Sequence, residues 1–310
     1  MNSLPIISLS NLDRDSSNEG EINKLYRACY EYGFFYLNEH GISQAAVDNA
    51  IKVSRKFFEL PEAVKLNYRQ EIQKVYPKTS RGYIPFSGEF LNQETGFDSK
   101  EVFDLGLEKP RSEKPFTGPT IIPDETVSPG FATTHFYLQN EIMTKVVPKL
   151  LKAIALALGL EKTWFNEYFT EPILIQRSIY YPAGIGRAGK HTDGGIFTVL
   201  IQEYFSNPSL RVYAKEAWID ATCMKDAFVI NLGDMLQFWT KGLFVSTPHE
   251  VIHNTSASRI SIPFFVYPNI DTIIQPFGTE EKISSQEMML KNFESIWETY
   301  EGAGRAKELK

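Results

Sequence analysis

Three residues in the second half of the chain have the types and spacing of a metal site. His191 and Asp193 are two residues apart, so in an extended segment both side chains point to the same side. An imidazole and a carboxylate on one face are a pair of metal ligands, and His249 is the candidate third ligand. Two histidines and one carboxylate, with the other coordination positions open, are typical of non-haem Fe(II) oxygenases. We therefore predict that His191, Asp193 and His249 form a catalytic metal site.

The remaining histidines are weaker candidates. His253 competes for the third position because it follows His249 by four residues and would share its face on a straight strand. The sequence around His249 decides for His249, and we expect His253 to be a polar loop or strand residue. We expect structural roles for His40, beside a glycine, and for His135, at the start of a predicted helix.

A second group of residues could hold a small carboxylate. Arg259 follows His249 by ten residues, and Ser261 lies two residues further along. At strand spacing the guanidinium and the hydroxyl face the same way and can grip one carboxylate between them. An iron site with such a clamp is suited to binding 2-oxoglutarate. Without Ser261 and the predicted metal site, an ordinary strand-end arginine would be the better interpretation of Arg259.

The ordered set of motifs resembles the isopenicillin N synthase-like family of Fe(II)/2-oxoglutarate-dependent oxygenases over nearly the whole chain. Besides the metal and clamp residues, the segments that carry the resemblance are Gly33-Phe34-Phe35-Tyr36, His40-Gly41-Ile42, Arg81-Gly82-Tyr83, Lys100-Glu101-Val102-Phe103-Asp104, Asn231-Leu232-Gly233-Asp234-Met235-Leu236-Gln237, Trp239-Thr240 and Ser246-Thr247-Pro248-His249-Glu250-Val251. A His-x-Asp pair alone recurs by chance. The ordered set, with its ten-residue step from histidine to arginine, is specific.

The resemblance implies which residues bind iron and its co-substrate. Fe(II) would be held by the three predicted ligands, and 2-oxoglutarate would chelate it through its keto-acid end. The far carboxylate of 2-oxoglutarate would bind Arg259, Ser261 and Tyr181. One departure from the family pattern is Ile179, since many plant relatives have asparagine at that position.

The resemblance also implies the chemistry. O₂ would bind the open iron position, and decarboxylation of 2-oxoglutarate would give succinate and CO₂. A ferryl intermediate would then take a hydrogen atom from a small-molecule substrate. Hydroxylation, desaturation and oxidative ring closure are all compatible with the sequence.

A buried arginine suggests a class of substrate. If Tyr181 points into the barrel, Arg177 on the same strand does so too. An arginine among apolar side chains needs an anionic partner, because an unpaired buried charge is very costly. Relatives place basic substrate-contacting residues near Arg177 and Arg81, so we predict a small, carboxylate-bearing metabolite bound by these two arginines. Equally, an internal Asp or Glu could pair with Arg177, and Arg81 could anchor a loop.

Several apolar residues are candidates for the pocket wall. Tyr83, Phe103 and Phe265 are predicted to contact the substrate. Aromatic and methionine side chains at such spacing, Met235 included, are more often ordinary core residues.

Three other functions share these features. Oxidases of the same family use the same metal triad without 2-oxoglutarate, and their Arg-x-Ser pair binds a substrate carboxylate. A non-catalytic binding module on this scaffold is a second alternative, although an intact triad and clamp argue against it. A two-histidine, one-aspartate site could also hold zinc for hydrolysis, but no nearby general base suggests that reaction.

Composition excludes some classes of partner. The chain has 310 residues, 43% of them hydrophobic, and a net charge of −6, so a large core is expected and general binding to nucleic acid or membranes is not. The two cysteines are far apart and form no CxxC pair, which fits a reducing compartment. No leader-like or membrane-spanning stretch is evident. We predict a cytoplasmic monomer.

The elements that must position these residues follow from hydrophobic spacing. We predict a mixed α/β protein with a double-stranded β-helix (jelly-roll) core, flanked by helices and preceded by an α/β N-terminal region. Its parts are an N-terminal region over 4–110, a surface linker over 107–130, a scaffold helix over 131–160 interrupted at Pro148, a jelly-roll core over 171–272, and a C-terminal helix and tail over 280–310. Ser43 is expected to cap a helix that runs to Glu59. Within the core, strands are expected over 173–181, 196–202, 210–213, 227–231 and 259–267.

Overall fold

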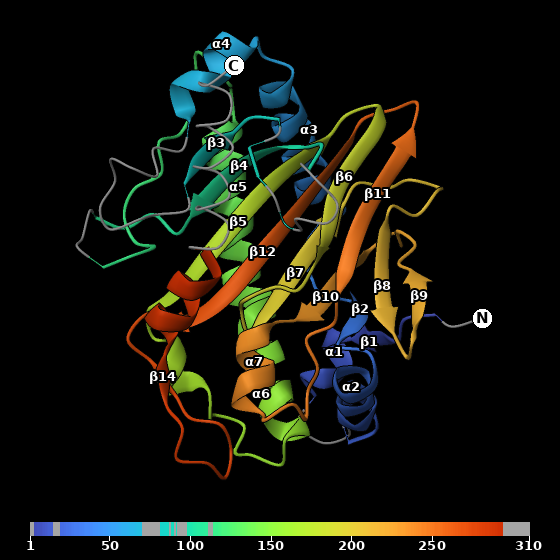
Figure 1. Ribbon diagram of the computed structural model, residues 1–310, viewed down its shortest axis with the longest axis vertical. Helices are drawn as coiled ribbons and strands as arrows, with labels where there is room; N and C mark the ends of the chain where they lie inside the picture. The colour runs from blue at the N-terminus through green and yellow to red at the C-terminus, as the bar shows by residue number, and fades with distance from the viewer. Residues whose placement is uncertain are drawn as a thin grey trace, which may run out of the picture.

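The computed structural model describes residues 3–14, 19–69, 81–86, 88–89, 91, 98–110 and 114–293. Two sheets dominate it (Figure 1). The larger sheet has the strand order β1-β2-β10-β7-β12-β5-β4-β3, and the smaller has the order β6-β11-β8-β9. These strands are β1 (Ile6–Ser8), β2 (Phe34–Asn38), β3 (Gly82–Ile84), β4 (Glu101–Gly106), β5 (Pro172–Tyr181), β6 (Gly184–His191), β7 (Phe197–Gln202), β8 (Leu210–Ala214), β9 (Ala217–Asp220), β10 (Ala227–Leu232), β11 (His249–Thr255) and β12 (Arg259–Asn269). This confirms the predicted jelly-roll core.

The larger sheet has a different environment on each face. Along β12 the even-numbered side chains from Ile260 to Val266 join the main hydrophobic core, whereas the odd-numbered ones from Arg259 to Tyr267 line a cavity between the sheets. Successive strand residues face opposite sides, so this alternation fixes which residues can meet a ligand. A smaller apolar cluster, with members from both sheets such as Ile179 and Val251, lies on the cavity side.

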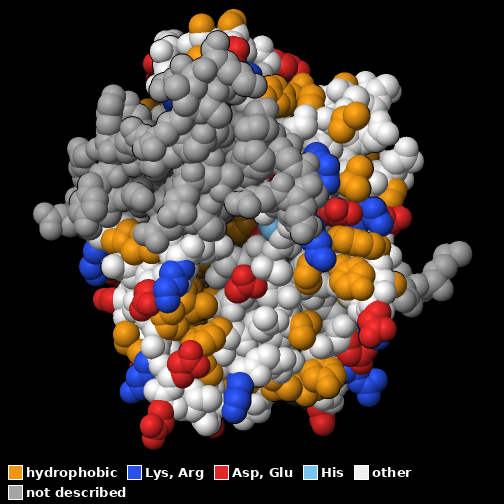
Figure 2. All heavy atoms as spheres, viewed as in Figure 1, with side chains coloured by type: hydrophobic (Ala, Val, Ile, Leu, Met, Phe, Trp, Pro, Cys, Tyr) orange, Lys and Arg blue, Asp and Glu red, His pale blue; other side chains and the backbone are white. Residues whose placement is uncertain are grey.

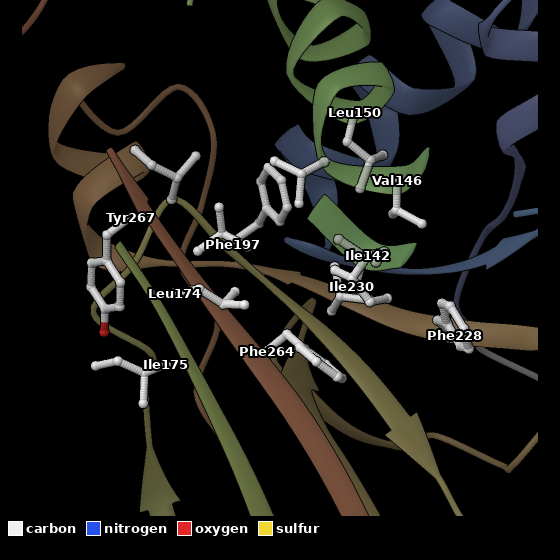
Figure 3. Packing of buried hydrophobic residues seen from close by; sticks show 14 of the residues in the cluster. Ile142, Val146, Leu150, Leu174, Ile175, Phe197, Phe228, Ile230, Phe264 and Tyr267 are labelled. Atoms are coloured by element: carbon white, nitrogen blue, oxygen red, sulfur yellow. The ribbon is translucent and has the colours of Figure 1, made fainter. Parts of the chain in front are cut away.

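Helices cover the other face of the larger sheet. Figure 3 shows Ile142, Val146 and Leu150 facing Phe264 and Ile230 of the sheet. The helices are α1 (Leu9–Leu12), α2 (Glu19–Glu31), α3 (Gln44–Phe58), α4 (Glu62–Lys65), α5 (Phe131–Glu141), α6 (Val147–Ala157) and α7 (Asp234–Trp239). Ser43 caps α3 as expected, because its side chain accepts a hydrogen bond from the amide of Ala46 at 3.3 Å.

The predicted scaffold helix consists of two helices. A π-helical turn, Ile142–Val146, joins α5 to α6, and Pro148 lies in the first turn of α6. Proline has no amide proton to donate to the preceding turn, and π-helical turns inside helices accommodate such local changes in hydrogen bonding. The interruption expected at Pro148 is present, and the chain continues beyond it in nearly the same direction (Figure 1).

The segment over 107–130 differs from the surface linker that its prolines and glycines suggested. Phe116 is 1% exposed and packs against Phe293 with ring centroids 5.0 Å apart. Thr117, Thr120 and Ser128 are also buried. The described part of this segment is therefore anchored to the body of the protein, and its interpretation as a surface linker was wrong.

The end of the described chain closes one side of the cavity. Residues 285–293 are helical, and Asn292 and Phe293 line the cavity. The rest of the C-terminal helix and tail predicted over 280–310 lies outside the described residues. In the part of the chain that the structure covers, no helix is both long and apolar enough to span a membrane.

Candidate active site

The three predicted metal ligands converge between the two sheets. His191 ends β6 and His249 begins β11, and the two residues are direct partners in the pairing of these strands. Asp193 follows β6, and its Oδ1 lies 3.7 Å from Nε2 of both histidines. One ligand atom from each residue lies within 4.8 Å of the others. The sequence interval of 56 residues (249 − 193) between Asp193 and His249 is thus closed by strand pairing.

Hydrogen bonds orient both imidazoles for metal binding. Nδ1 of His191 lies 2.6 Å from the carbonyl oxygen of Gly189, and Nδ1 of His249 lies 3.1 Å from that of Thr247. A carbonyl oxygen only accepts, so each Nδ1 carries the proton and donates it. Each Nε2 then keeps its lone pair, and each lies 3.7 Å from Oδ1 of Asp193. Fixing the tautomer through the other ring nitrogen is the usual arrangement around metal-binding histidines.

The second oxygen of Asp193 is already occupied. Oδ2 accepts hydrogen bonds from Thr198 Oγ1 at 2.6 Å and from Asn231 Nδ2 at 2.7 Å. Oδ1 alone remains for a metal, which favours coordination through one oxygen. Sequence reasoning did not assign this role to Thr198 on β7 or Asn231 on β10, although Asn231 begins one of the segments that carried the family resemblance.

The loop that carries Asp193 is also fixed. The amide of Asp234, at the start of α7, donates to the carbonyl oxygen of Asp193 at 2.7 Å. The hydroxyl of Thr192 donates to the carboxylate of Asp234 at 3.0 Å. Gly194 has no side chain to keep Asn292 away, since a Cβ there would lie 2.3 Å from the amide nitrogen of Asn292. The metal-ligand loop and the C-terminal helix are therefore in close contact.

The electrostatics of the site suit a divalent metal. Burial, followed by the nearby His249, lowers the pKa of His191 to about 3, so this imidazole is neutral at physiological pH. Burial alone would raise the pKa of Asp193, but the two histidines and the donors Thr198 and Asn231 outweigh it and lower that pKa. A buried carboxylate beside two histidine side chains is a donor set that fits Fe(II).

A cavity of about 320 Å³ opens beside these ligands. Figure 2 shows a histidine side chain at the bottom of a hollow near the middle of this face. Its lining includes Phe34, Leu91, Lys100, Ile175, Arg177, Ile179, Tyr181, Ala188, Leu200, Leu210, Val251, Arg259, Ser261, Pro263, Phe265, Tyr267, Asn292 and Phe293. The predicted metal ligands and the predicted carboxylate clamp thus share one cavity.

Arg259 is arranged as a carboxylate binder. It is 2% exposed, its Nη2 donates to Gln202 Oε1 at 2.8 Å, and its guanidinium carbon lies 5.4 Å from the ring centre of Tyr181. Nη1 is buried and has no hydrogen-bond partner in the described part of the chain. Burial lowers the pKa of Arg259. A buried guanidinium nitrogen without an acceptor, beside Ser261, fits the far carboxylate of 2-oxoglutarate.

Arg177 is paired within the chain, unlike Arg259. Its Nε and Nη2 each lie 2.8 Å from an oxygen of Asp104, and its Nη1 and Nη2 each lie 3.0 Å from an oxygen of Glu89. Arg177 does line the cavity, but the chain itself supplies two anionic partners. The reason for expecting a substrate carboxylate at this position was therefore wrong, and the alternative of internal pairing describes the contacts.

Lys100 joins the same group of ion pairs, and it was not singled out from the sequence. Lys100 lines the cavity, and its Nζ lies 2.9 Å from Asp98 and 3.2 Å from Glu89. We refer to Glu89, Asp98, Lys100, Asp104 and Arg177 as the charge cluster. A possible signal was Lys100 itself, because it opens the segment Lys100–Asp104 that carried the resemblance.

The other predicted substrate residues divide into two groups. Phe265 lines the cavity. Arg81 lies against the backbone of Gly106 and donates to the carbonyl oxygen of Phe116, away from the cavity. Tyr83 hydrogen-bonds to Glu101. Phe103, like Tyr83, packs in the main core, so the structure does not support substrate contact for Arg81, Tyr83 or Phe103.

The other histidines described have partners within the chain. Nε2 of His253 donates to the carbonyl oxygen of Ala257 at 2.7 Å, and its Nδ1 lies 3.1 Å from Ser209 Oγ. The ring of His40 stacks on Phe228 with centroids 3.7 Å apart. His135 lies within hydrogen-bonding distance of Ser54 and Gln176. None of these three belongs to the metal cluster.

Comparison with known proteins agrees with this geometry. Residues 4–125 match the family described as the N-terminal region of the non-haem dioxygenase in morphine synthesis, and residues 171–268 match the 2OG-Fe(II) oxygenase superfamily. A Dictyostelium discoideum protein named "Probable iron/ascorbate oxidoreductase" is 32% identical, over 92% of this chain and 86% of its own. The chain belongs to the 2OG-Fe(II) oxygenase superfamily. Its resemblance to the isopenicillin N synthase-like branch is thereby confirmed.

Two further relatives bear on its chemistry. A 1-aminocyclopropane-1-carboxylate oxidase of Dictyostelium discoideum is 27% identical, over 91% of this chain and 86% of its own. The crystal structure of a full-length Neurospora crassa protein in complex with alpha-KG and thymine matches with a TM-score of 0.81 and 25% identity, over 94% of this chain and 96% of that one. The chain is an oxidoreductase of the dioxygenase class, and Fe(II), 2-oxoglutarate and O₂ are its cofactor and co-substrates.

Proposed function

We propose that this oxygenase oxidises a C–H bond of a small metabolite, with His191, Asp193 and His249 holding Fe(II). Bound iron supplies O₂ activation, coupled to the conversion of 2-oxoglutarate to succinate and CO₂. The observation that carries the proposal is that a ready metal-ligand set and the unpartnered, buried Nη1 of Arg259 share one cavity. The protein's own task is to bind, orient and exclude water.

Each part of the cavity has a task in this proposal. Arg259, Ser261 and Tyr181 bind the far carboxylate of 2-oxoglutarate, with Arg259 donating from Nη1. Apolar side chains such as Leu200 and Leu210 keep water from the reacting centre, which suppresses side reactions. The substrate occupies the remaining space, beside the C-terminal helix. Supporting this division, the clamp residues come from β5 and β12, whereas Asn292 and Phe293 come from the C-terminal helix.

The test is Fe(II)-dependent succinate formation by the purified protein. Wild type should consume 2-oxoglutarate and release succinate and CO₂ even without substrate, at a low uncoupled rate, and Asp193→Ala should abolish both this activity and tight Fe(II) binding. Tyr213→Phe, which changes an exposed tyrosine of β8, is the matched control and should behave as wild type. Fe(II)-dependent O₂ uptake without succinate would instead favour an oxidase in which Arg259 binds a substrate carboxylate, as the likeness to an oxidase allows. No metal-dependent O₂ uptake at all would leave a binding module.

The chemistry of the substrate is less constrained. The neighbouring crystal structure contains thymine, an uncharged ring, whereas the sequence suggested a carboxylate. That suggestion depended on an unpaired Arg177, and the pairing with Asp104 and Glu89 removes its basis. Reaction outcome, monomeric state and cytoplasmic location remain predictions.

A further inference from the structure

The cavity has a polar group that neither the metal site nor the clamp uses. Tyr267 lines the cavity and is 2% exposed. It belongs to the same alternating row on β12 as Arg259 but lies eight residues further along (267 − 259). Its ring lies against the metal-ligand loop, because a Cβ on Gly195 would be 3.6 Å from its Cε1. Tyr267 therefore lies beside the metal-ligand loop, at the end of the row away from the clamp.

The hydroxyl of Tyr267 has no acceptor among the residues that the structure describes. Figure 3 shows it pointing toward Ile175 and away from the ring of Phe197. Within the described part of the chain it makes no hydrogen bond. Buried tyrosine hydroxyls usually have a partner. A phenol with an ordinary pKa of about 10 keeps its proton at neutral pH, so this group is a donor directed into the cavity.

The charges around the cavity disfavour a carboxylate as that acceptor. Among the described residues, the cations that line the cavity are Lys100, Arg177 and Arg259. Lys100 and Arg177 are held by buried carboxylates of the charge cluster, and Arg259 is assigned to 2-oxoglutarate. A substrate carboxylate would have to compete with these anions or remain unpaired, and an unpaired buried charge is very costly.

A neutral oxygen meets no such penalty. The cavity lining also offers apolar surface, with Ile175, Phe265 and Phe293 among its residues, while the charged groups nearest Tyr267, such as Arg177 and Asp104, are paired with each other. An apolar body could bury its surface against the apolar side chains while one oxygen accepts from the hydroxyl. Ligand sites commonly combine apolar walls with a few polar groups that fix orientation.

We propose that the substrate is an uncharged molecule with an apolar body, whose carbonyl or other neutral oxygen accepts a hydrogen bond from Tyr267. This deepens the proposed function, on which it rests, and replaces the carboxylate expected from the sequence. Tyr267 is then a specificity-determining residue that directs one end of the substrate toward the metal.

Three probes of the same shape separate the chemistries. Acetophenone carries a neutral carbonyl, benzoate a carboxylate, and α-methylstyrene an apolar CH₂ group in place of the carbonyl oxygen. Their dissociation constants are measured by ligand-observed NMR on the full chain, loaded with Fe(II) and 2-oxoglutarate without oxygen. Wild type should bind acetophenone more tightly than either of the other probes.

The variant Tyr267→Phe removes only the hydroxyl. It should raise the dissociation constant of acetophenone about tenfold, the usual contribution of one hydrogen bond. The dissociation constant of α-methylstyrene should change by no more than about twofold. If the substitution disturbed the cavity, both neutral probes would bind more weakly. The difference between the two changes in dissociation constant therefore separates hydrogen bonding from packing. Tyr213→Phe, an exposed tyrosine of β8, is the matched control and should change neither.

Three results would overturn the proposal. They are tighter binding of benzoate than of acetophenone, equal weakening of both neutral probes in Tyr267→Phe, and no binding of acetophenone at millimolar concentration. Succinate formation by wild type is measured on the same preparation. If succinate forms while the probes behave as in any of these results, the proposed function stands and only the assignment of Tyr267 fails. If no succinate forms, the proposed function fails first.

Discussion

Two buried arginines on neighbouring strands face the same cavity, yet their surroundings are opposite. Arg177 on β5 has two carboxylates, Asp104 and Glu89, around its guanidinium. Arg259 on β12 has an amide oxygen, a tyrosine ring and one nitrogen without a partner. Burial lowers the pKa of each, but the two carboxylates outweigh it for Arg177 and raise its pKa, whereas that of Arg259 stays lowered.

The difference separates a structural charge from a ligand-binding charge. Burying a guanidinium is costly unless an anion compensates it. For Arg177 the chain provides the anions during folding. For Arg259 the described chain supplies no carboxylate, and an incoming carboxylate can compensate the buried charge. The position of an arginine in the cavity wall therefore does not tell whether it binds a ligand, and the state of its partners does.

The sharpest test of this comparison removes Arg177. Arg177→Met leaves the carboxylates of Glu89 and Asp104 without the cation between them, so the free energy of unfolding should fall by about 3–5 kcal/mol. Denaturant titration followed by tryptophan fluorescence measures it. The matched control is Arg211→Met, whose ion pairs with Asp220 and Glu250 involve a half-exposed guanidinium and should contribute less than about 1 kcal/mol. Equal losses in the two variants would refute the structural role.

Removing Arg259 should impair 2-oxoglutarate binding without lowering stability. Arg259→Met should raise the KM for 2-oxoglutarate about 10- to 100-fold, because a charge-assisted pair of hydrogen bonds is lost. The free energy of unfolding should stay the same or rise, since a buried cation without a carboxylate partner disappears. Initial rates of succinate formation at varied 2-oxoglutarate concentration measure the KM. A loss of stability as large as that of Arg177→Met would remove the distinction between the two arginines.

How far the sequence could anticipate this site depends on the kind of residue. The triad, Arg259 and Ser261 lie in short motifs, and the sequence named them. It did not find β6 and β11, the strands that bring His191 and His249 together. β6 reads GIGRAGKH and β11 reads HEVIHNT; glycine and polar residues weaken the alternation that identifies strands. Their pairing is a tertiary property, set by the strands beside them.

The partners of Arg177 were beyond sequence reasoning for a similar reason. Arg177 and Asp104 are 73 residues apart and meet because β4 and β5 pair in register. The predicted strand gave the direction of the Arg177 side chain correctly, into the cavity. It could not tell which carboxylates would be there, because that depends on strand order. Arg81, Tyr83 and Phe103 were misplaced in the same way, since each faces the helices or a neighbouring loop.

A smaller effect is expected where the chain supports a metal ligand. Thr198→Val removes one of the two hydrogen bonds to Oδ2 of Asp193 and keeps the shape of the side chain. Support residues of this kind typically contribute about tenfold or more in metal affinity, so anaerobic Fe(II) titration should show a dissociation constant about tenfold higher. The matched control is Thr144→Val, which loses a hydrogen bond to the carbonyl oxygen of Asn140 on the far helix. Unchanged Fe(II) affinity in Thr198→Val would show that Asn231 alone suffices.

A pH-dependent effect is expected at a buried polar group that, like Arg177, has its hydrogen-bond partners within the chain. Burial lowers the pKa of His135 from 6.5 to about 3, and Gln176 and Ser54 hydrogen-bond its neutral ring. As the pH falls below 6.5, His135 becomes protonated in the unfolded chain but stays neutral in the folded protein. Its contribution to stability is therefore complete above that pH and declines toward pH 3, by at most about 1.4 kcal/mol per pH unit.

The variant His135→Gln isolates this contribution, because glutamine can donate and accept but carries no charge. Between about pH 6 and pH 4, the unfolding free energy of wild type should fall more steeply than that of the variant. The difference in slope should be at most about 1.4 kcal/mol per pH unit. Urea titrations at several pH values measure the two slopes. The KM for 2-oxoglutarate should be the same in both, since His135 lies on the helix side of the sheet, away from the cavity. Equal slopes would mean that His135 takes up its proton in the folded protein as readily as in the unfolded chain. A changed KM would mean that His135, on the helix side of the sheet, is coupled to the 2-oxoglutarate site on the other side.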